Sequence, residues 1–477
     1  MRIKQDSFGI PKKKTDILLY LCSRFKANRM AENYTKLGSK KISRLLFSLS
    51  LPSMIGMFAN AIYNIIDTIF VGRGVGSLGI AAVTIVLPII AIISSFAHMI
   101  GIGTSSLISR KLGKGDVQEV NAIAGNGFLL IILVGIFFSI IGVIFTDPIM
   151  RAFGATESIL PLAHDYGQIV FIGMLWFPFC VGTSNYLRAE GFAREAMFAM
   201  LLGILVNTVL DYIFIFPMNM GIRGAALATI LGKFSTLLYL IWYFSGSKSI
   251  ISIKLRYLRL QKHILKPSLS VGLSGFGMRS SSSFANIVLN HTLGALGGDT
   301  AIAVFGIIYK TTLFFGMPFF GLNQGMQPIV GYNFGAEQYQ RVKHTVKLVI
   351  KYSLIYGAIA VIFFEIFSRD IFTLFTNEQK LLSQGPRALR IVVMMMWLMG
   401  VNTMSMGIHQ AMGQAKQSFV LAILRWVLLI TPLILILPQI KGLGLDGVWF
   451  AFPAADFMAA VVSLFILYNT FKQKQIV

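Results

Sequence analysis

Residues 52–72 read Pro-Ser-Met-Ile-Gly-Met-Phe-Ala-Asn-Ala-Ile-Tyr-Asn-Ile-Ile-Asp-Thr-Ile-Phe-Val-Gly, and this stretch decides how the rest of the chain is interpreted. It is apolar and long enough to cross a bilayer as a helix, which takes about 20 residues. Asn60, Tyr63 and Asp67 follow one another at spacings of three and four, so they share one helix face. A carboxylate inside such a run is costly unless it faces protein or water. Asp67 therefore predicts a functional site.

A second acid stands inside another apolar run. Asp211 follows Asn207 by four residues within the run 194–217, so these two side chains also share a face. We predict that Asp67 and Asp211 form the ion-coupling site of a transporter. Their oxygens suit H⁺ or Na⁺, and Asp67, Asn207 and Asp211 would be the ligands of Na⁺. The chain has no phosphate-binding loop motif, so transport would run on an ion gradient, with no other cofactor.

The composition is that of a polytopic membrane protein. Of 477 residues, 55% are hydrophobic and 13% are charged, whereas soluble domains carry about 25% charged residues. The formal net charge of +23 would favour nucleic acid as a partner of a soluble protein. Here the cations cluster between apolar runs, where they orient a membrane protein and contact anionic lipid. Membrane lipid is expected as a partner, and nucleic acid is not.

The hydrophobic pattern predicts an all-α fold with an even number of spans. Twelve runs are long enough to cross the membrane, at approximately residues 46–72, 78–108, 121–146, 161–187, 194–217, 222–245, 267–292, 300–331, 342–367, 384–411, 418–438 and 446–470.

Lys and Arg gather in alternate connections, which sets the expected orientation. The connection after the fourth span contributes Arg188 and Arg194, and the longest one, after the sixth span, carries six cations. The positive-inside rule places these connections and both termini in the cytoplasm of a protein of the inner cell membrane. A basic cytoplasmic extension is expected at 1–44, with Met30 as an alternative start. The N-lobe would hold helices 1–6 at 45–246, and the C-lobe would hold helices 7–12 at 267–471. A cytoplasmic linker at 247–266 would join the lobes, and a cytoplasmic tail would follow at 472–477.

Three short motifs recur at nearly the same offset and indicate an internal repeat. Gly-Lys-Gly at 113–115 is matched by Gly-Ala-Glu at 335–337, and Gly191 is matched by Gly413 at the same separation. Gly-Ile-Arg-Gly begins at 221 and Gly-Leu-Asp-Gly begins at 444, a separation longer by one position. Six spans repeated in one orientation predict two lobes related by an axis along the membrane normal, with a substrate site near the middle of the membrane.

Four motifs of the N-terminal half follow one another in a characteristic order: Tyr-Asn-Ile-Ile-Asp-Thr-Ile-Phe-Val-Gly (63–72), Gly-Ile-Ala-Ala-Val-Thr (79–84), Leu-Arg-Ala-Glu-Gly (187–191) and Gly-Ala-Ala-Leu-Ala-Thr (224–229). With these motifs the chain resembles the multidrug and toxic compound extrusion (MATE) transporters over roughly residues 42–470, and most closely the bacterial MepA-like group near the DinF branch. The resemblance implies twelve transmembrane helices in two six-helix bundles related by pseudo-two-fold symmetry. It also implies a monomer that is not an enzyme and that exports small-molecule drugs by antiport with H⁺ or Na⁺, as in antibiotic resistance.

The family's cation site maps onto this chain residue by residue. By that resemblance, Tyr63 and Asp67 on the first span would couple the cation together with the residues of two later spans, Asn207, Asp211 and Thr229. Pro52 would bend the first helix. The chain departs from the NorM-like branch, whose seventh helix carries an acid, because the seventh span here carries Arg279 and no carboxylate.

Other polar residues in the spans have two readings. Asn60 and Met200 share the faces of the acidic residues, and together with Asn185 they are predicted either to line the substrate cavity or to pack in the core. Four charges of the C-lobe spans are predicted to form a buried salt-bridge cluster, or to act as a relay or an anionic contact: Arg279, Lys310, Arg425 and Asp456. The alternatives to drug export are a lipid-linked oligosaccharide flippase of the same superfamily and an integral membrane enzyme.

Overall fold

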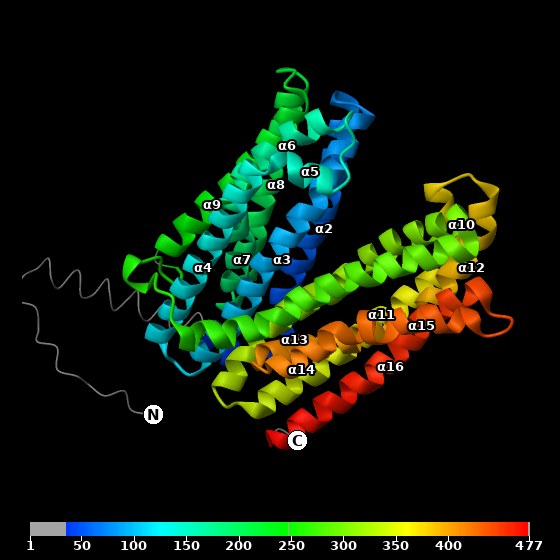
Figure 1. The fold of residues 1–477 in the computed structure, drawn as a ribbon. Helices are drawn as coiled ribbons and strands as arrows, with labels where there is room; N and C mark the ends of the chain where they lie inside the picture. The colour runs from blue at the N-terminus through cyan, green and yellow to red at the C-terminus, as the bar shows by residue number, and fades with distance from the viewer. Residues whose placement is uncertain (1–34, 247, 476–477) are drawn as a thin grey trace, which may run out of the picture.

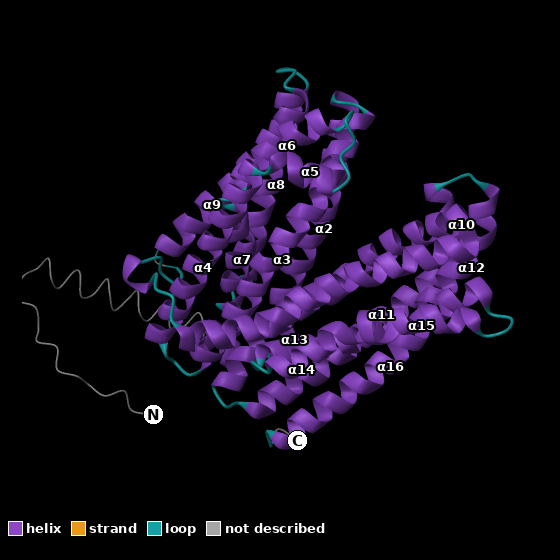
Figure 2. Cartoon of the chain, in the orientation of Figure 1, coloured by secondary structure: helices purple, strands orange, loops and turns teal. Residues whose placement is uncertain are grey.

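The computed structural model describes residues 35–246 and 248–475, which form helices joined by short loops (Figure 2). The proposed alternative start at Met30 lies outside these residues. The first half contains α2 (Ile42–Gly74), α3 (Ser77–Gly113), α4 (Val117–Ile144), α5 (Thr146–Ala152), α6 (Leu160–Gly173), α7 (Phe177–Ala189), α8 (Ala193–Ile215) and α9 (Gly221–Ser245). The second half contains η1 (Leu255–Tyr257), α10 (Lys262–Gly335), α11 (Tyr339–Phe375), α12 (Gln379–Val393), α13 (Met396–Ala411), α14 (Ala415–Ile423), η2 (Leu424–Ile430), α15 (Thr431–Ile436), η3 (Leu437–Gln439) and α16 (Gly444–Gln473).

The described helices provide twelve membrane spans, as the sequence predicts. Nine helical segments are long and apolar enough to cross a bilayer, and two bent pairs, α6 with α7 and α12 with α13, each make one more. The long α10 holds two spans, because Gly298 interrupts it with a φ of 59° and a ψ of −157°. Glycine adopts this backbone conformation without the steric cost of a Cβ atom. The bends of 45° and 46° fall in the fourth span of each half, which supports the internal repeat.

The two halves form two lobes that meet at one end and diverge toward the other (Figure 1). At the converging end, α3 packs directly on the first span of α10. A Cβ atom added to Gly103 would lie 1.8 Å from the carbonyl oxygen of Ser268, and one on Gly272 would lie 1.9 Å from that of Met99. Only glycine permits such close backbone contact between helices. The small residues of α3 and α10 therefore make the joint between the lobes.

A buried carboxylate fastens the connection between the lobes to the N-lobe. Glu190, directly after α7, accepts hydrogen bonds from the backbone nitrogens of Ile250 and Ile251 at 2.7 and 2.9 Å and from the hydroxyl of Ser249. Burial raises the pKa of Glu190 to about 7, although the three donors act in the opposite direction. The start of the connecting segment is thus held at the converging end.

Candidate cation site in the N-lobe

The structure brings the two predicted acids together between α2 and α8. Asp211 is fully buried and Asn207 is 3% exposed, while Asp67 is half-buried. Asp67 and Asp211 lie close enough for direct electrostatic interaction, and Asn207 lies beside Asp211. The faces predicted from helical spacing therefore do meet in the interior of the lobe.

Hydroxyl groups from two further helices complete this cluster. Thr229 on α9 lies next to Tyr63 on α2, and it also lies next to Tyr166 on α6. Asp67 and Asp211 act electrostatically on both tyrosines. Tyr166 was not identified from the sequence, because no spacing rule links it to the acids and the chain has 15 tyrosines.

Several polar atoms of the cluster are buried without a hydrogen-bond partner among the described residues. They are both carboxylate oxygens of Asp211, both amide atoms of Asn207 and the hydroxyl of Thr229. Buried polar atoms are normally paired, so these atoms point to a site that binds something further. Carboxylate, amide and hydroxyl oxygens suit H⁺ or a hard cation such as Na⁺. The described residues contain no cluster of three His, Cys, Asp or Glu side chains that could hold a metal ion.

The acids have no basic partner in the described part of the chain. No ion pair involves Asp67 or Asp211, and no Lys, Arg or His side chain is among the groups that act on them. Two unpaired carboxylates in a low-dielectric interior repel each other strongly. A proton or a bound cation would relieve this repulsion.

The other residues predicted for the N-lobe occupy different places. Asn60 is half-buried on α2, and Met200 on α8 packs against α2, since its terminal methyl would lie 2.3 Å from a Cβ on Gly56. Pro52 is buried within α2, which runs without interruption from Ile42 to Gly74. Asn185 on α7 lines a small polar pocket between the lobes. The bend at Pro52 stays a prediction.

Of the four C-lobe charges predicted to form a cluster, Arg425 and Asp456 form a pair and the other two do not join it. Arg425 binds Asp456 through its Nε atom at 2.5 Å and through a second nitrogen at 3.3 Å. The side chain of Asp456 is 2% exposed and that of Arg425 is 12% exposed. Arg279 and Lys310 are exposed and have no ion pair within the described residues. The charge of Asp456 is therefore already balanced by Arg425.

Two bundles of six spans, with a cluster of buried acidic and polar side chains in one of them, define the architecture of a polytopic membrane transporter. The MatE family model matches residues 52–213 and 276–436, about two thirds of the chain, and places one repeat in each lobe. This chain therefore belongs to the MatE family, the multidrug and toxic compound extrusion transporters. It is a multi-pass membrane protein, as the apolar spans require.

Known relatives agree with this assignment over nearly the whole chain. The multidrug export protein MepA of Staphylococcus aureus (strain MRSA252) is 27% identical over 427 residues, which cover 90% of this chain and 94% of MepA. A solved MATE structure in the straight conformation is 29% identical, has a TM-score of 0.86 and covers 93% of this chain and 98% of its own. A multidrug resistance MATE family transporter in an outward-facing conformation is 28% identical, has a TM-score of 0.85 and covers the same shares.

Proposed function

We propose that this protein is a secondary active exporter of amphipathic drugs that works by antiport with H⁺ or Na⁺. The observation that carries the proposal is the buried pair Asp67 and Asp211, which lies in the N-lobe without a basic partner among the described residues. A membrane protein that keeps two such acids uses them to bind and release a cation. The name of the S. aureus relative, multidrug export protein, supports the class of cargo.

The shape of the protein supports alternating access. The lobes converge at the end that holds the basic connections, and that end is cytoplasmic by the positive-inside rule (Figure 1). The structure then corresponds to an outward-facing state of a protein whose two termini are cytoplasmic. Binding of a cation to Asp67 and Asp211 removes their attraction for a cationic cargo, and this favours release of the cargo outside.

Dye efflux in vesicles tests the proposal. Inverted vesicles that contain the full chain receive an amphipathic cationic dye, ethidium, with a pH gradient or a sodium gradient imposed separately. We expect one of the two gradients to drive dye transport and its dissipation to stop it. Transport that is indifferent to both gradients would refute the antiport proposal.

A further inference from the structure

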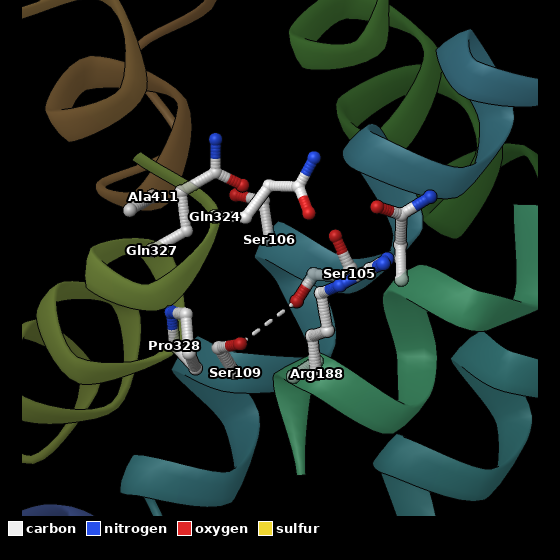
Figure 3. A pocket seen from close by; sticks show the side chains of 10 residues that line it. Ser105, Ser106, Ser109, Arg188, Gln324, Gln327, Pro328 and Ala411 are labelled. Atoms are coloured by element: carbon white, nitrogen blue, oxygen red, sulfur yellow. Dashed lines mark hydrogen bonds between the residues drawn. The ribbon is translucent and has the colours of Figure 1, made fainter. Parts of the chain in front are cut away.

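The small polar pocket that Asn185 lines lies between the lobes at the converging end, apart from the acid pair (Figure 3). The N-lobe contributes Ser105 and Ser106 from α3 and Arg188 from α7, and the C-lobe contributes Gln324 and Gln327 from α10. Its volume of about 20 Å³ leaves room for about one water molecule, so the lobes are closed here. Separation of the lobes at this end would expose the whole pocket.

Arg188 is the charged group of this pocket, and it has no partner in the described part of the chain. Its Nε atom is buried without a hydrogen bond, and no ion pair reaches its guanidinium within the described residues. The sequence places Arg188 in a basic connection, but it lies on α7 and lines the pocket between the lobes. The oxygen Oε1 of Gln324 is also buried and unpaired. Arg188 as a whole is half-buried, and a cation held partly out of water without a counterion favours a negatively charged partner.

Arg188 shares a neighbour, His98, with a second arginine. Arg279, on the first span of α10, and Arg188 are both close enough to His98 on α3 to act on it electrostatically. No carboxylate is among the groups that act on any of these three in the described residues. The surface between the lobes is therefore cationic, in contrast to the acid pair inside the N-lobe.

We propose that this pocket binds an oxyanion, a carboxylate or a phosphate, carried by an amphipathic molecule. The proposal rests on the transport function proposed above and extends its cargo from cations such as ethidium to amphipathic molecules that also carry negative charge, zwitterions included. The guanidinium of Arg188 presents planar donors that match a carboxylate or a phosphate, and the nearby serine hydroxyls and glutamine amides supply further donors.

One hydrogen bond across the closed pocket indicates how an oxyanion would act on the lobes. The hydroxyl of Ser106 in the N-lobe donates to the backbone oxygen of Gln410 in the C-lobe at 2.5 Å. Within the C-lobe, the side chain of Gln410 donates to Ser274 at 2.9 Å and accepts from Gln327 at 2.9 Å. An oxyanion that accepts from Ser106 would replace the bond between the lobes and favour their separation at this end.

The test compares two dyes that differ in one charge, rhodamine B, which carries a carboxylate, and its ethyl ester. Binding to the full-length protein in detergent is followed by fluorescence polarisation. The wild type should bind rhodamine B more tightly than the ester. Arg188→Gln should weaken binding of rhodamine B about tenfold and leave the ester within about twofold, since charge-assisted hydrogen bonds are the strong ones. Arg194→Gln is the matched control, because Arg194 is an exposed cation of the same connection.

Two further variants keep the test decisive if Arg188→Gln does not fold. Arg188→Lys retains the positive charge, so its affinity for rhodamine B should lie between that of the wild type and that of Arg188→Gln. Gln324→Glu places a carboxylate beside Arg188, and it should weaken the binding of rhodamine B as much as Arg188→Gln does. The proposal would be overturned if the variants lost affinity for both dyes equally or for neither dye. It would also be overturned if the wild type did not prefer rhodamine B to its ester. Because no ion gradient is used, this result is independent of the efflux assay that tests the transport function.

Lipid nanodiscs distinguish the two sources of the oxyanion. Phosphatidylglycerol is added as a competitor of rhodamine B binding. If it lowers dye binding to the wild type but not to Arg188→Lys or Gln324→Glu, the pocket binds an anionic lipid headgroup. Absence of competition would assign it to the cargo. Either result supports an oxyanion site, provided that the dye preference holds.

Discussion

The two lobes share one scaffold but treat buried charge in opposite ways. At the offset that the repeated glycine motifs define, Asp67 corresponds to Leu289 and Asp211 corresponds to Leu433. Leu289 is fully buried. The buried acid of the described C-lobe, Asp456, is bound to Arg425. The acids of the N-lobe have no basic partner among the described residues, whereas Asp456 in the C-lobe is paired with an arginine.

This difference teaches that the scaffold alone does not make a coupling site. Gly76 and Gly298 are related by the same offset, and both adopt positive φ between the first two spans of their lobes, so the backbone repeat is preserved. What differs is whether a carboxylate has a cationic partner. Coupling is therefore expected to depend on the N-lobe, and the C-lobe pair is expected to serve stability.

The largest effect is expected from neutralising either acid of the N-lobe. Asp67→Asn and Asp211→Asn should each reduce gradient-driven dye efflux to the level of vesicles without the protein, because the amide neither releases a proton nor binds Na⁺ as a carboxylate does. Protein in the membrane is quantified alongside. Glu157→Gln is the control, since this acid is exposed and paired with Arg151. Unimpaired efflux in both Asn variants would remove the N-lobe from coupling.

The next effect concerns the C-lobe pair and should appear in stability. Arg425→Met leaves Asp456 buried without a partner, which should lower the free energy of unfolding by about 3–5 kcal/mol. The double variant Arg425→Met with Asp456→Leu should regain most of that loss and retain efflux. Thermal unfolding in detergent and vesicle efflux measure the two quantities. A folded double variant that transports no dye would show that the C-lobe also takes part in coupling.

A smaller effect is expected from the hydroxyl that Tyr166 adds to the acid cluster. Tyr166→Phe removes one polar contact, worth about 0.5–1.5 kcal/mol, so the ion concentration for half-maximal efflux should change about three- to tenfold. Tyr212→Phe serves as the control, because Tyr212 is adjacent to Asp211 in sequence but is 56% exposed. An equal response of both variants would mean that Tyr166 lies outside the functional site.

The smallest effect lies at the connection between the lobes. Burial raises the pKa of Glu190 from 4.5 to about 7. A raised pKa in the folded state stabilises the protein at low pH, and this contribution is lost as pH rises through about 7. The melting temperature of the wild type should therefore fall relative to that of Glu190→Gln between about pH 4.5 and pH 7 and level off above pH 7. A wild type that becomes relatively more stable over this range would contradict the assignment.

The fold and the acid pair could be predicted because both are governed by strong local costs. An apolar run of this length must span a membrane, and an acid such as Asp67 inside it must have a reason to be there. The breaks in the fourth and tenth spans escaped prediction, since the hydrophobic run continues through them and Pro178 alone does not locate the bend. Tyr166 and the inward position of Arg188 depend on packing between helices, which spacing within one helix does not encode.

Infrared difference spectroscopy of carboxyl protonation, recorded on changing pH and on adding Na⁺, tests directly whether the N-lobe acids bind the coupling ion. The full-length protein carries Glu190→Gln throughout, because burial raises the pKa of Glu190 to about 7 and this acid would add its own signal. We expect a carboxylic acid signal that responds to pH or Na⁺ in this background and in the variant that adds Arg425→Met and Asp456→Leu, and we expect the signal to be absent when Asp67 and Asp211 are both replaced by Asn. A signal that persists without the two N-lobe acids, or that disappears with the C-lobe pair, would overturn the role of the N-lobe acids.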